Sequence, residues 1–230
     1  MTTLRTRRSY AGPFVCLAAA ACTGGGASAE PETAPRPPAS AAAEIEALYE
    51  ARKDSARAHF TAADVSFMTG MIGHHAQAIV MGRLAPTHGA SQSVQTLAAR
   101  IINAQKDEIA TMQRWLRDRG QPVPEVHIRG LDLMVHGADH ARHMPGMLTP
   151  DQLRELDRAR GPAFDRLFLE YMIQHHGGAV TMVRDLFGND GAGQDEEAFR
   201  LASDIQVDQI TEIARMELML SELSAGGRTQ

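Results

Sequence analysis

A pair of adjacent histidines framed by methionines occurs twice in this chain, and this repeat constrains the fold more than any other feature. The second copy follows the first at an offset of 101 residues. The shared positions are Asp64/Asp165, Phe67/Phe168, Met71/Met172, Ile72/Ile173, His74/His175, His75/His176, Ala78/Ala179 and Met81/Met182. At 100° per residue, the Phe, Met, His and Ala positions of each copy lie within an arc of about 140° on a helix. Each copy therefore predicts a helix that turns both histidines toward an apolar interior.

A second repeat follows each histidine helix, at an offset of 104 residues. Its matched positions are Leu97/Leu201, Ala98/Ala202, Ile101/Ile205, Gln105/Gln209, Glu108/Glu212, Ile109/Ile213 and Met112/Met216. Each half of the chain thus predicts an αα-hairpin, and two hairpins must pack together to bury their apolar faces. Because no strand-like alternation of any length is evident, the sequence predicts an all-α, ferritin-like four-helix bundle with a long, partly helical connection over about 119–162.

The chain divides into three parts: a leader (1–29), a Pro/Ala-rich spacer with a peripheral helix (30–58) and a His/Met-rich helical domain (59–225). The leader has three arginines, an apolar run too short to span a membrane, and then small residues, which is the layout of a secretory signal. Two processing sites remain open, lipid attachment at Cys22 and cleavage after Ala29. Both predict an exported protein of the periplasm or cell envelope, and Cys22 offers the one route to a membrane.

The predicted elements follow local start and stop signals. Thr61 and Asp64 form a capping-box-like start for the helix that carries the first histidine pair, and Thr149-Pro150 starts a short helix. Gly161-Pro162 breaks that short helix and starts the one with the second pair. The expected ranges are a flexible spacer at 30–43 and helices at 44–58, 67–84, 91–118, 131–141, 162–186 and 196–224.

Charge and cysteine content limit the function. The formal net charge is −5, and beyond the leader 20 basic side chains face 28 acidic ones. An acidic chain of this kind argues against nucleic acid as the main partner. Both cysteines lie in the leader, so any metal site in the helical domain has to use His, Met or carboxylate ligands.

The buried polar residues of the repeat are candidate metal ligands. An unpaired imidazole or carboxylate in an apolar interior costs several kcal/mol, so these groups are either metal-bound or joined in a polar network that only orders the core. In ferritin-like di-iron proteins a glutamate precedes the histidine by three positions. In this chain Met71 and Met172 occupy that position. A thioether in place of a carboxylate favours copper, particularly Cu(I), over iron, although another transition metal remains open. The candidate ligands of the repeat are Met71, His74, His75, Met81, Met172, His175, His176, Met182, Glu108 and Glu212.

A third group of candidate ligands lies in the connection between the halves. The predicted helix over 131–141 places His136 and His140 on one face, and the following turn adds further ligands. The alternative interpretation is a solvated connector with scattered histidines. The members of the group are His136, His140, His143, Met144 and Met147. His59, His88 and His127 are isolated in the sequence and predicted to lie on the surface.

These motifs resemble the bacterial domain-of-unknown-function family 305, the CopM-like proteins. The resemblance covers about residues 60–222. It depends on the doubled Asp-x-x-Phe-x-x-x-Met-Ile-x-His-His motif, on Met144-Pro145-Gly146-Met147-Leu148-Thr149 and on the two Gln-x-x-Glu-Ile helices. It implies an exported ferritin-like bundle, with copper binding and copper tolerance in some members.

Three functions are compatible with the sequence. The first is copper sequestration or handling in the cell envelope, without catalysis, alone or with a homo-oligomeric or copper-transfer partner. The second is a metal-dependent redox enzyme that uses the same His and Glu residues. The third is a metal-free scaffold or interaction bundle in the envelope.

Overall fold

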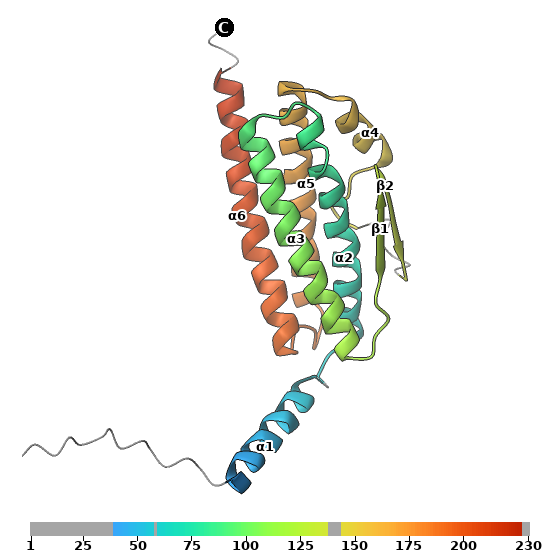
Figure 1. Cartoon of the computed structure of the whole chain (residues 1–230), viewed down its shortest axis with the longest axis vertical. Helices are drawn as coiled ribbons and strands as arrows, with labels where there is room; N and C mark the ends of the chain where they lie inside the picture. The colour runs from blue at the N-terminus through green and yellow to red at the C-terminus, as the bar shows by residue number, and fades with distance from the viewer. Residues whose placement is uncertain (1–38, 58, 138–143, 227–230) are drawn as a thin grey trace, which may run out of the picture. The chain divides into compact units, whose positions relative to one another are not determined.

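The computed structural model of the chain describes residues 39–57, 59–137 and 144–226 (Figure 1). The predictions for the leader, including Cys22, and for His140 and His143 lie outside these residues. The chain divides into a unit of residues 1–43 and a unit of residues 44–230. The elements are α1 (Ala39–Arg57), α2 (Ala62–Gly82), the 3-10 turn η1 (Ala85–Thr87), α3 (Gln92–Asp118), β1 (Glu125–Arg129), β2 (Asp132–His136), α4 (Pro150–Arg158), α5 (Pro162–Phe187) and α6 (Glu196–Gly226). No helix in the described part of the chain is long and apolar enough to cross a membrane.

Helix starts match the capping signals in the sequence. Thr61 and Asp64 form a reciprocal capping box at the start of α2, with the Thr61 amide 2.8 Å from the Asp64 carboxylate. Thr149 caps α4 in the same way, with Pro150 at its first position. The predicted helices at 91–118, 162–186 and 196–224 are confirmed with small shifts at their ends. Helix α1 begins at Ala39 rather than at residue 44, so the end of the predicted spacer is helical.

The all-α prediction is wrong between residues 125 and 136, where β1 and β2 form an antiparallel hairpin. Val126 and Ile128 alternate with polar residues in β1, and the half-buried Leu133 and Val135 alternate with more exposed residues in β2, which suits half-exposed strands. Gly130 supplies the positive φ of 58° that the tight turn needs. The predicted helix over 131–141 is therefore absent from its described part, 131–137. The reasoning that placed His136 and His140 on one helical face fails with it.

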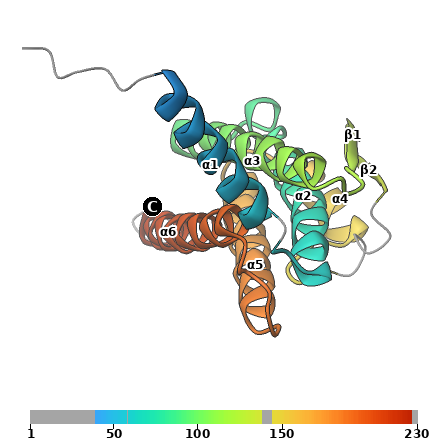
Figure 2. The same cartoon turned by 90° about the horizontal axis from the view of Figure 1, so that it is seen from below.

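Helices α2, α3, α5 and α6 surround the histidine pairs. Helix α2 contacts α3, α5 contacts α6, and α2 contacts α5. The hairpin lies against α2, on the side away from α6 (Figures 1 and 2). Two apolar clusters fill the interior. One joins the start of α2 to the end of α5, and the other joins the end of α2 to the start of α5. The histidine pairs lie between the two clusters. The interior therefore contains one layer of polar side chains with apolar packing on either side of it.

Reciprocal hydrogen bonds tie the two halves of the chain together. The carboxylate of Asp64, in the first turn of α2, accepts a hydrogen bond from the Gly193 amide at 2.7 Å, in the loop before α6. Asp165 occupies the matching position in α5 and accepts from the Ser91 amide at 3.1 Å, just before α3. Each histidine helix therefore anchors the loop that precedes the second helix of the other half.

A buried ion pair closes the end of the interior near the α5–α6 loop. The Arg119 guanidinium bonds the Asp195 carboxylate, and the Trp115 indole donates to the same carboxylate at 3.0 Å. Arg119 also reaches the half-exposed Glu197 at 3.2 Å. These contacts hold α3 to the start of α6.

Candidate metal centre

The four histidines of the repeat form one buried layer between α2 and α5. None of the four side chains has any exposed surface. The rings of His74 and His175 stack at the centre, with centroids 3.9 Å apart and planes tilted by 37°. His75 and His176 lie outside this pair, next to α3 and α6 respectively. The prediction that both pairs point into the interior is confirmed.

Each histidine turns its Nε2 atom toward an oxygen. His74 Nε2 lies 3.0 Å from the Pro145 carbonyl oxygen, and His175 Nε2 lies 3.1 Å from the His74 carbonyl oxygen. His176 Nε2 lies 2.7 Å from Glu212 Oε2. These oxygens accept hydrogen bonds, so they select the tautomer with the proton on Nε2 and leave the Nδ1 lone pair free.

His75 departs from this pattern in one respect. Its Nε2 lies 2.8 Å from Glu108 Oε2, but the two atoms are not aligned for a hydrogen bond. The contact is therefore a short electrostatic one, and it still favours the proton on Nε2. A small rotation of either side chain would complete the bond.

All four Nδ1 atoms are buried without a hydrogen-bond partner among the described residues. The same holds for both amide atoms of Gln105 and for Gln209 Oε1. A buried polar atom left unsatisfied costs about 1–3 kcal/mol, so a concentration of them in one layer calls for a ligand or bound solvent. The alternative, a polar network that satisfies itself, accounts for the Nε2 atoms of His74, His175 and His176 but not for His75 Nε2 or for the four Nδ1 atoms.

Burial keeps the central imidazoles neutral. Desolvation, reinforced by the nearby His75, lowers the pKa of His74 to about 3. Desolvation followed by the proximity of His74 also lowers the pKa of His175 well below its ordinary value. Neutral imidazole is the form that binds metals, so neither side chain needs to lose a proton first.

Carboxylates lie on the outer side of the layer. Glu108 and Glu212 face His75 and His176, and both side chains are mostly buried. Burial, then the nearby charges of Glu108 and Glu212, raises the pKa of Asp208. Negative charge is thus concentrated where α3 approaches α6, and this favours a cation in the adjoining layer.

The loop of residues 144–147 covers the other side of the layer. Gly146 has a φ of 76°, and a Cβ there would stand 2.6 Å from the Gln174 carbonyl oxygen. A Cβ on Gly178 would overlap the Pro145 carbonyl and stand 2.7 Å from the Gly146 Cα. Both glycines are needed for this backbone-to-backbone approach, which brings the Pro145 carbonyl to His74.

The side chains of Met144, from the same loop, and Met182, from α5, meet next to Gly70. The point where a Cβ on Gly70 would stand lies 3.2 Å from Met144 Sδ and 3.4 Å from Met182 Cε. Gly70 lies one helical turn before His74 on the same side of α2. We call this pair of side chains around Gly70 the thioether cradle. A β-carbon on residue 70 would fill part of the space that Gly70 leaves between these two methionine side chains.

The remaining predicted ligands are placed as follows. Met71, Met81 and Met172 are fully buried in the apolar clusters on either side of the layer, and Met182 is half-buried. His136 lies instead on the exposed face of the hairpin, and Met147 lines a cavity next to it. No three His, Cys, Asp or Glu side chains of the described residues gather around one point as a metal site would require.

Of the three histidines predicted to be isolated on the surface, His59 and His127 are exposed. The prediction for His88 is wrong, because only 6% of its surface is exposed. Its Nε2 lies 2.9 Å from the Asp157 carbonyl oxygen, and its Nδ1 lies 2.9 Å from the Thr87 hydroxyl. Both ring nitrogens are thus satisfied, and His88 holds η1 against α4 as a structural residue.

The sequence prediction missed the residues that seat the loop. Gln77 is buried, and its side chain makes two hydrogen bonds with the backbone of Leu148. It accepts from the Leu148 amide at 2.7 Å and donates to the Leu148 carbonyl at 3.0 Å. Gly70, Gly178 and the Pro145 carbonyl were also missed. One signal was available, because Gln77 and Gly178 occupy matching positions at which the two copies differ.

The structure resembles solved structures of one family. A DUF305 fragment from Deinococcus radiodurans is 31% identical, with 71% of this chain and 98% of that chain covered and a TM-score of 0.58. A DUF305 protein from Streptomyces coelicolor, inferred to be secreted, is 26% identical over 70% of this chain and 92% of that one, with a TM-score of 0.57. CopM in its Cu(I)-bound form is 28% identical over 69% of this chain and 96% of CopM, with a TM-score of 0.51.

CopM has also been solved with Cu(II), with silver and in its apo form. No curated protein matches the chain. The sequence pattern of the domain of unknown function DUF305 matches residues 64–220. The chain therefore belongs to the DUF305 family.

Proposed function

We propose that this chain is an exported copper-binding protein that sequesters or hands on Cu(I) in the cell envelope. The observation that carries the proposal is the state of the histidine layer. Each Nε2 faces a carbonyl or carboxylate oxygen, while each Nδ1 is buried and unpartnered among the described residues. Histidines that bind metals are held in this way, with the second ring nitrogen donating to an oxygen that fixes the tautomer.

Sulfur from the methionines completes the ligand set in this proposal. The thioether cradle and the buried Met71 and Met172 offer soft donors beside neutral imidazoles. Imidazole with thioether favours copper, and particularly Cu(I), over magnesium, calcium or manganese. The proposed ligands are His74, His75, His175 and His176 with Met71, Met81, Met144, Met172 and Met182, and Glu108 and Glu212 hold the outer histidines or add a donor.

The relatives support the choice of metal. CopM binds Cu(I), Cu(II) and silver, and at 28–29% identity it shares this chain's helical arrangement. Silver is a soft monovalent ion like Cu(I), so its binding to CopM is what a thioether-containing site would give. The proposed role here is binding without turnover.

We further propose that residues 59–225 form a ferritin-like four-helix bundle from two repeated αα-hairpins. The contacts of α2 with α3 and of α5 with α6 support it, as do the reciprocal bonds of Asp64 and Asp165. Export rests on the leader sequence and on the Streptomyces relative. Processing of the leader, by lipid attachment at Cys22 or by cleavage after Ala29, and a transfer partner belong to the same proposal.

The test is a competition titration of the purified chain with Cu(I) and Ag(I). In the double variant His74→Ala/His175→Ala, metal affinity should fall about 100-fold or more, since altering even outer-shell partners costs about 10–100-fold. His88→Ala is the matched control, because His88 is also buried but has both ring nitrogens satisfied. Equal affinity for the double variant and the unmodified chain, with both folded by circular dichroism, would refute the site assignment.

A further inference from the structure

The hairpin presents a second set of metal-binding side chains on its exposed face. In the register of β1 and β2, Glu125 pairs with His136, and His127 pairs with Met134. Side chains alternate between the two faces of a strand, so these four residues share one face. The opposite face carries the apolar residues of the hairpin, which pack toward α2.

The side chains of this face lie close to one another. The rings of His127 and His136 meet edge to face, with centroids 5.4 Å apart. His127 and Met134 are directly opposed across the strands, a relation that brings their Cβ atoms to about 4.5–5.5 Å. Glu125 Oε2 lies 3.7 Å from His127 Nε2. Two imidazoles and a thioether thus lie on one patch of the hairpin, with a carboxylate beside it. Three His or carboxylate side chains of the described residues do not converge here, so a metal ion on this patch would take the thioether as its third ligand.

Exposure distinguishes this patch from ordinary packing. Met134 is 49% exposed, although the hairpin buries its other apolar side chains more deeply. The His127 side chain is 56% exposed and that of Glu125 76%. Methionine here contributes little to the core, and exposed histidines can rotate to turn a ring nitrogen toward a shared ion.

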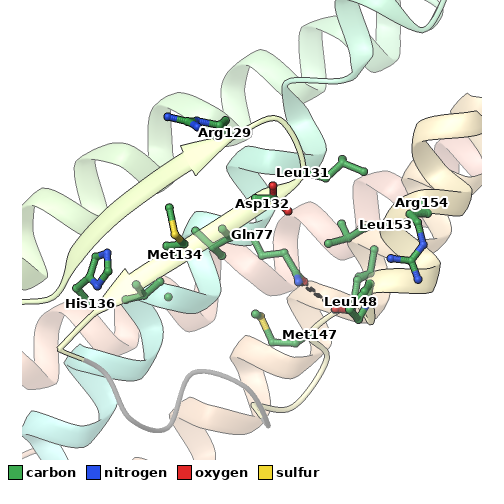
Figure 3. Close-up of a pocket in the computed structure, with 14 residues that line it drawn as sticks. Gln77, Arg129, Leu131, Asp132, Met134, His136, Met147, Leu148, Leu153 and Arg154 are labelled. Carbon is green, nitrogen blue, oxygen red and sulfur yellow. Dashed lines mark hydrogen bonds between the residues drawn. The ribbon is translucent and has the colours of Figure 1, made fainter.

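The patch also adjoins the interior site. Strand β2, including Met134 and His136, lines an open cavity of about 1360 Å³ whose other walls include Gly73 and Gln77 of α2 and Met147 (Figure 3). Gly73 immediately precedes His74. Two residues of the patch, Met134 and His136, thus border a cavity that also reaches α2, the helix of the first histidine pair.

We propose that His127, Met134 and His136 form a surface site that captures Cu(I), with Glu125 beside it. A site that combines imidazole and thioether ligands favours Cu(I), and favours Ag(I) as its mimic. Metal binding at this surface site depends only on the hairpin residues. Transfer of that metal to the histidine layer rests on the proposed function. It is a different grouping from the one predicted from sequence, which joined His136 to residues 140–147.

The test is titration of the purified full chain with Ag(I), which mimics Cu(I) without redox chemistry. The histidine ring protons are followed by NMR, and the bound silver is counted. The His127 and His136 signals should shift, and His127→Gln/Met134→Leu should bind one equivalent fewer. Arg129→Ala, on the same face but at the turn, is the matched control and should bind the full amount.

The interior double variant His74→Ala/His175→Ala separates the two sites. It should keep the hairpin equivalent and the shifts of His127 and His136, whatever becomes of interior binding. Unshifted His127 and His136 signals, or full stoichiometry in His127→Gln/Met134→Leu, would overturn the surface site and leave the interior proposal standing. Circular dichroism should show all variants folded, because the substitutions on the hairpin leave its apolar face intact.

Discussion

Replacing Gly178 with alanine should unseat the loop of residues 144–147 from the histidine layer. A Cβ at this position would stand 2.7 Å from the Gly146 Cα and overlap the Pro145 carbonyl. Carbon atoms in contact normally lie about 3.5–4.0 Å apart, so the loop has to retreat by about 1 Å or more. Both obstructing groups are backbone, and α5 is held by its own helical hydrogen bonds, so the loop is the part that moves.

The energetic cost can be worked from the contacts that the retreat breaks. The hydrogen bond from His74 Nε2 to the Pro145 carbonyl, now 3.0 Å, is lost. An orphaned buried donor costs about 1–3 kcal/mol, and the better helix propensity of alanine returns up to about 1 kcal/mol. With the lost packing, Gly178→Ala should lower the free energy of unfolding by about 2 kcal/mol. For a chain of this size that lowers Tm by about 4–8 °C.

Gly177 provides a control one residue away on the same helix. A Cβ there meets no atom within 4 Å among the described residues. Gly177→Ala should therefore stabilise the chain by up to about 1 kcal/mol through helix propensity alone. Thermal and urea melts of both variants measure the difference, and an Ag(I) titration reports on the thioether cradle. Equal stability of the two variants would refute the account of the loop.

Three further predictions concern other parts of the site and fold. In the metal-free protein, the pKa of His74 is about 3 when folded, against 6.5 when unfolded, so the unfolded state binds more protons between these pH values. The free energy of unfolding should fall as pH drops from 6.5 toward 3. Urea melts at pH 7 and pH 5 should give free energies of unfolding that differ by about 2 kcal/mol through His74 alone. An unchanged midpoint would contradict a buried, neutral His74. Gly70→Ala should narrow the thioether cradle and weaken Ag(I) binding about tenfold by competition titration while changing stability by less than about 1 kcal/mol; undiminished affinity would remove the cradle from the site. Asp195→Ala should cost about 3–5 kcal/mol in melts because it removes the buried partner of Arg119 and leaves this guanidinium only the half-exposed Glu197. Glu197→Ala, which keeps the buried partner, should cost less than about 1 kcal/mol.

The helices of this fold could be predicted because their signals are local. Capping residues such as Thr61 and Thr149 act within a single turn, and the histidine stripe is set by helical periodicity alone. The burial of all four histidines follows from the same periodicity. The hairpin was missed because the alternation in each strand is limited to five residues, and the spacing of His136 and His140 was interpreted as helical instead.

The candidate site was only partly predictable because its geometry depends on long-range contacts. His74 and His175 are 101 positions apart, and only the packing of α2 on α5 stacks their rings. The tautomers are set by oxygens from the loop and from the partner helices. Local sequence reasoning has no access to such contacts, so it predicted candidate ligands but not which ring nitrogen of each histidine is available.

The positions where the two copies of the repeat differ explain why the two halves of the site are not equivalent. Gly70 matches Tyr171, and Gln77 matches Gly178. Gly70 makes room for the thioethers, Gln77 grips Leu148, and Gly178 admits the loop backbone.

These three residues all contact or make room for the single loop of residues 144–148. One loop cannot dock in the same way on two helices at once, and the two histidine helices differ in sequence at the positions where it docks. The consequence is chemical as well as structural. His74 takes its oxygen from the loop at Pro145, whereas His175 takes its oxygen from the backbone of His74. In the proposed metal site, the first histidine pair is therefore the one whose metal affinity should depend on the loop, and the second pair should be the less sensitive of the two when the loop is displaced.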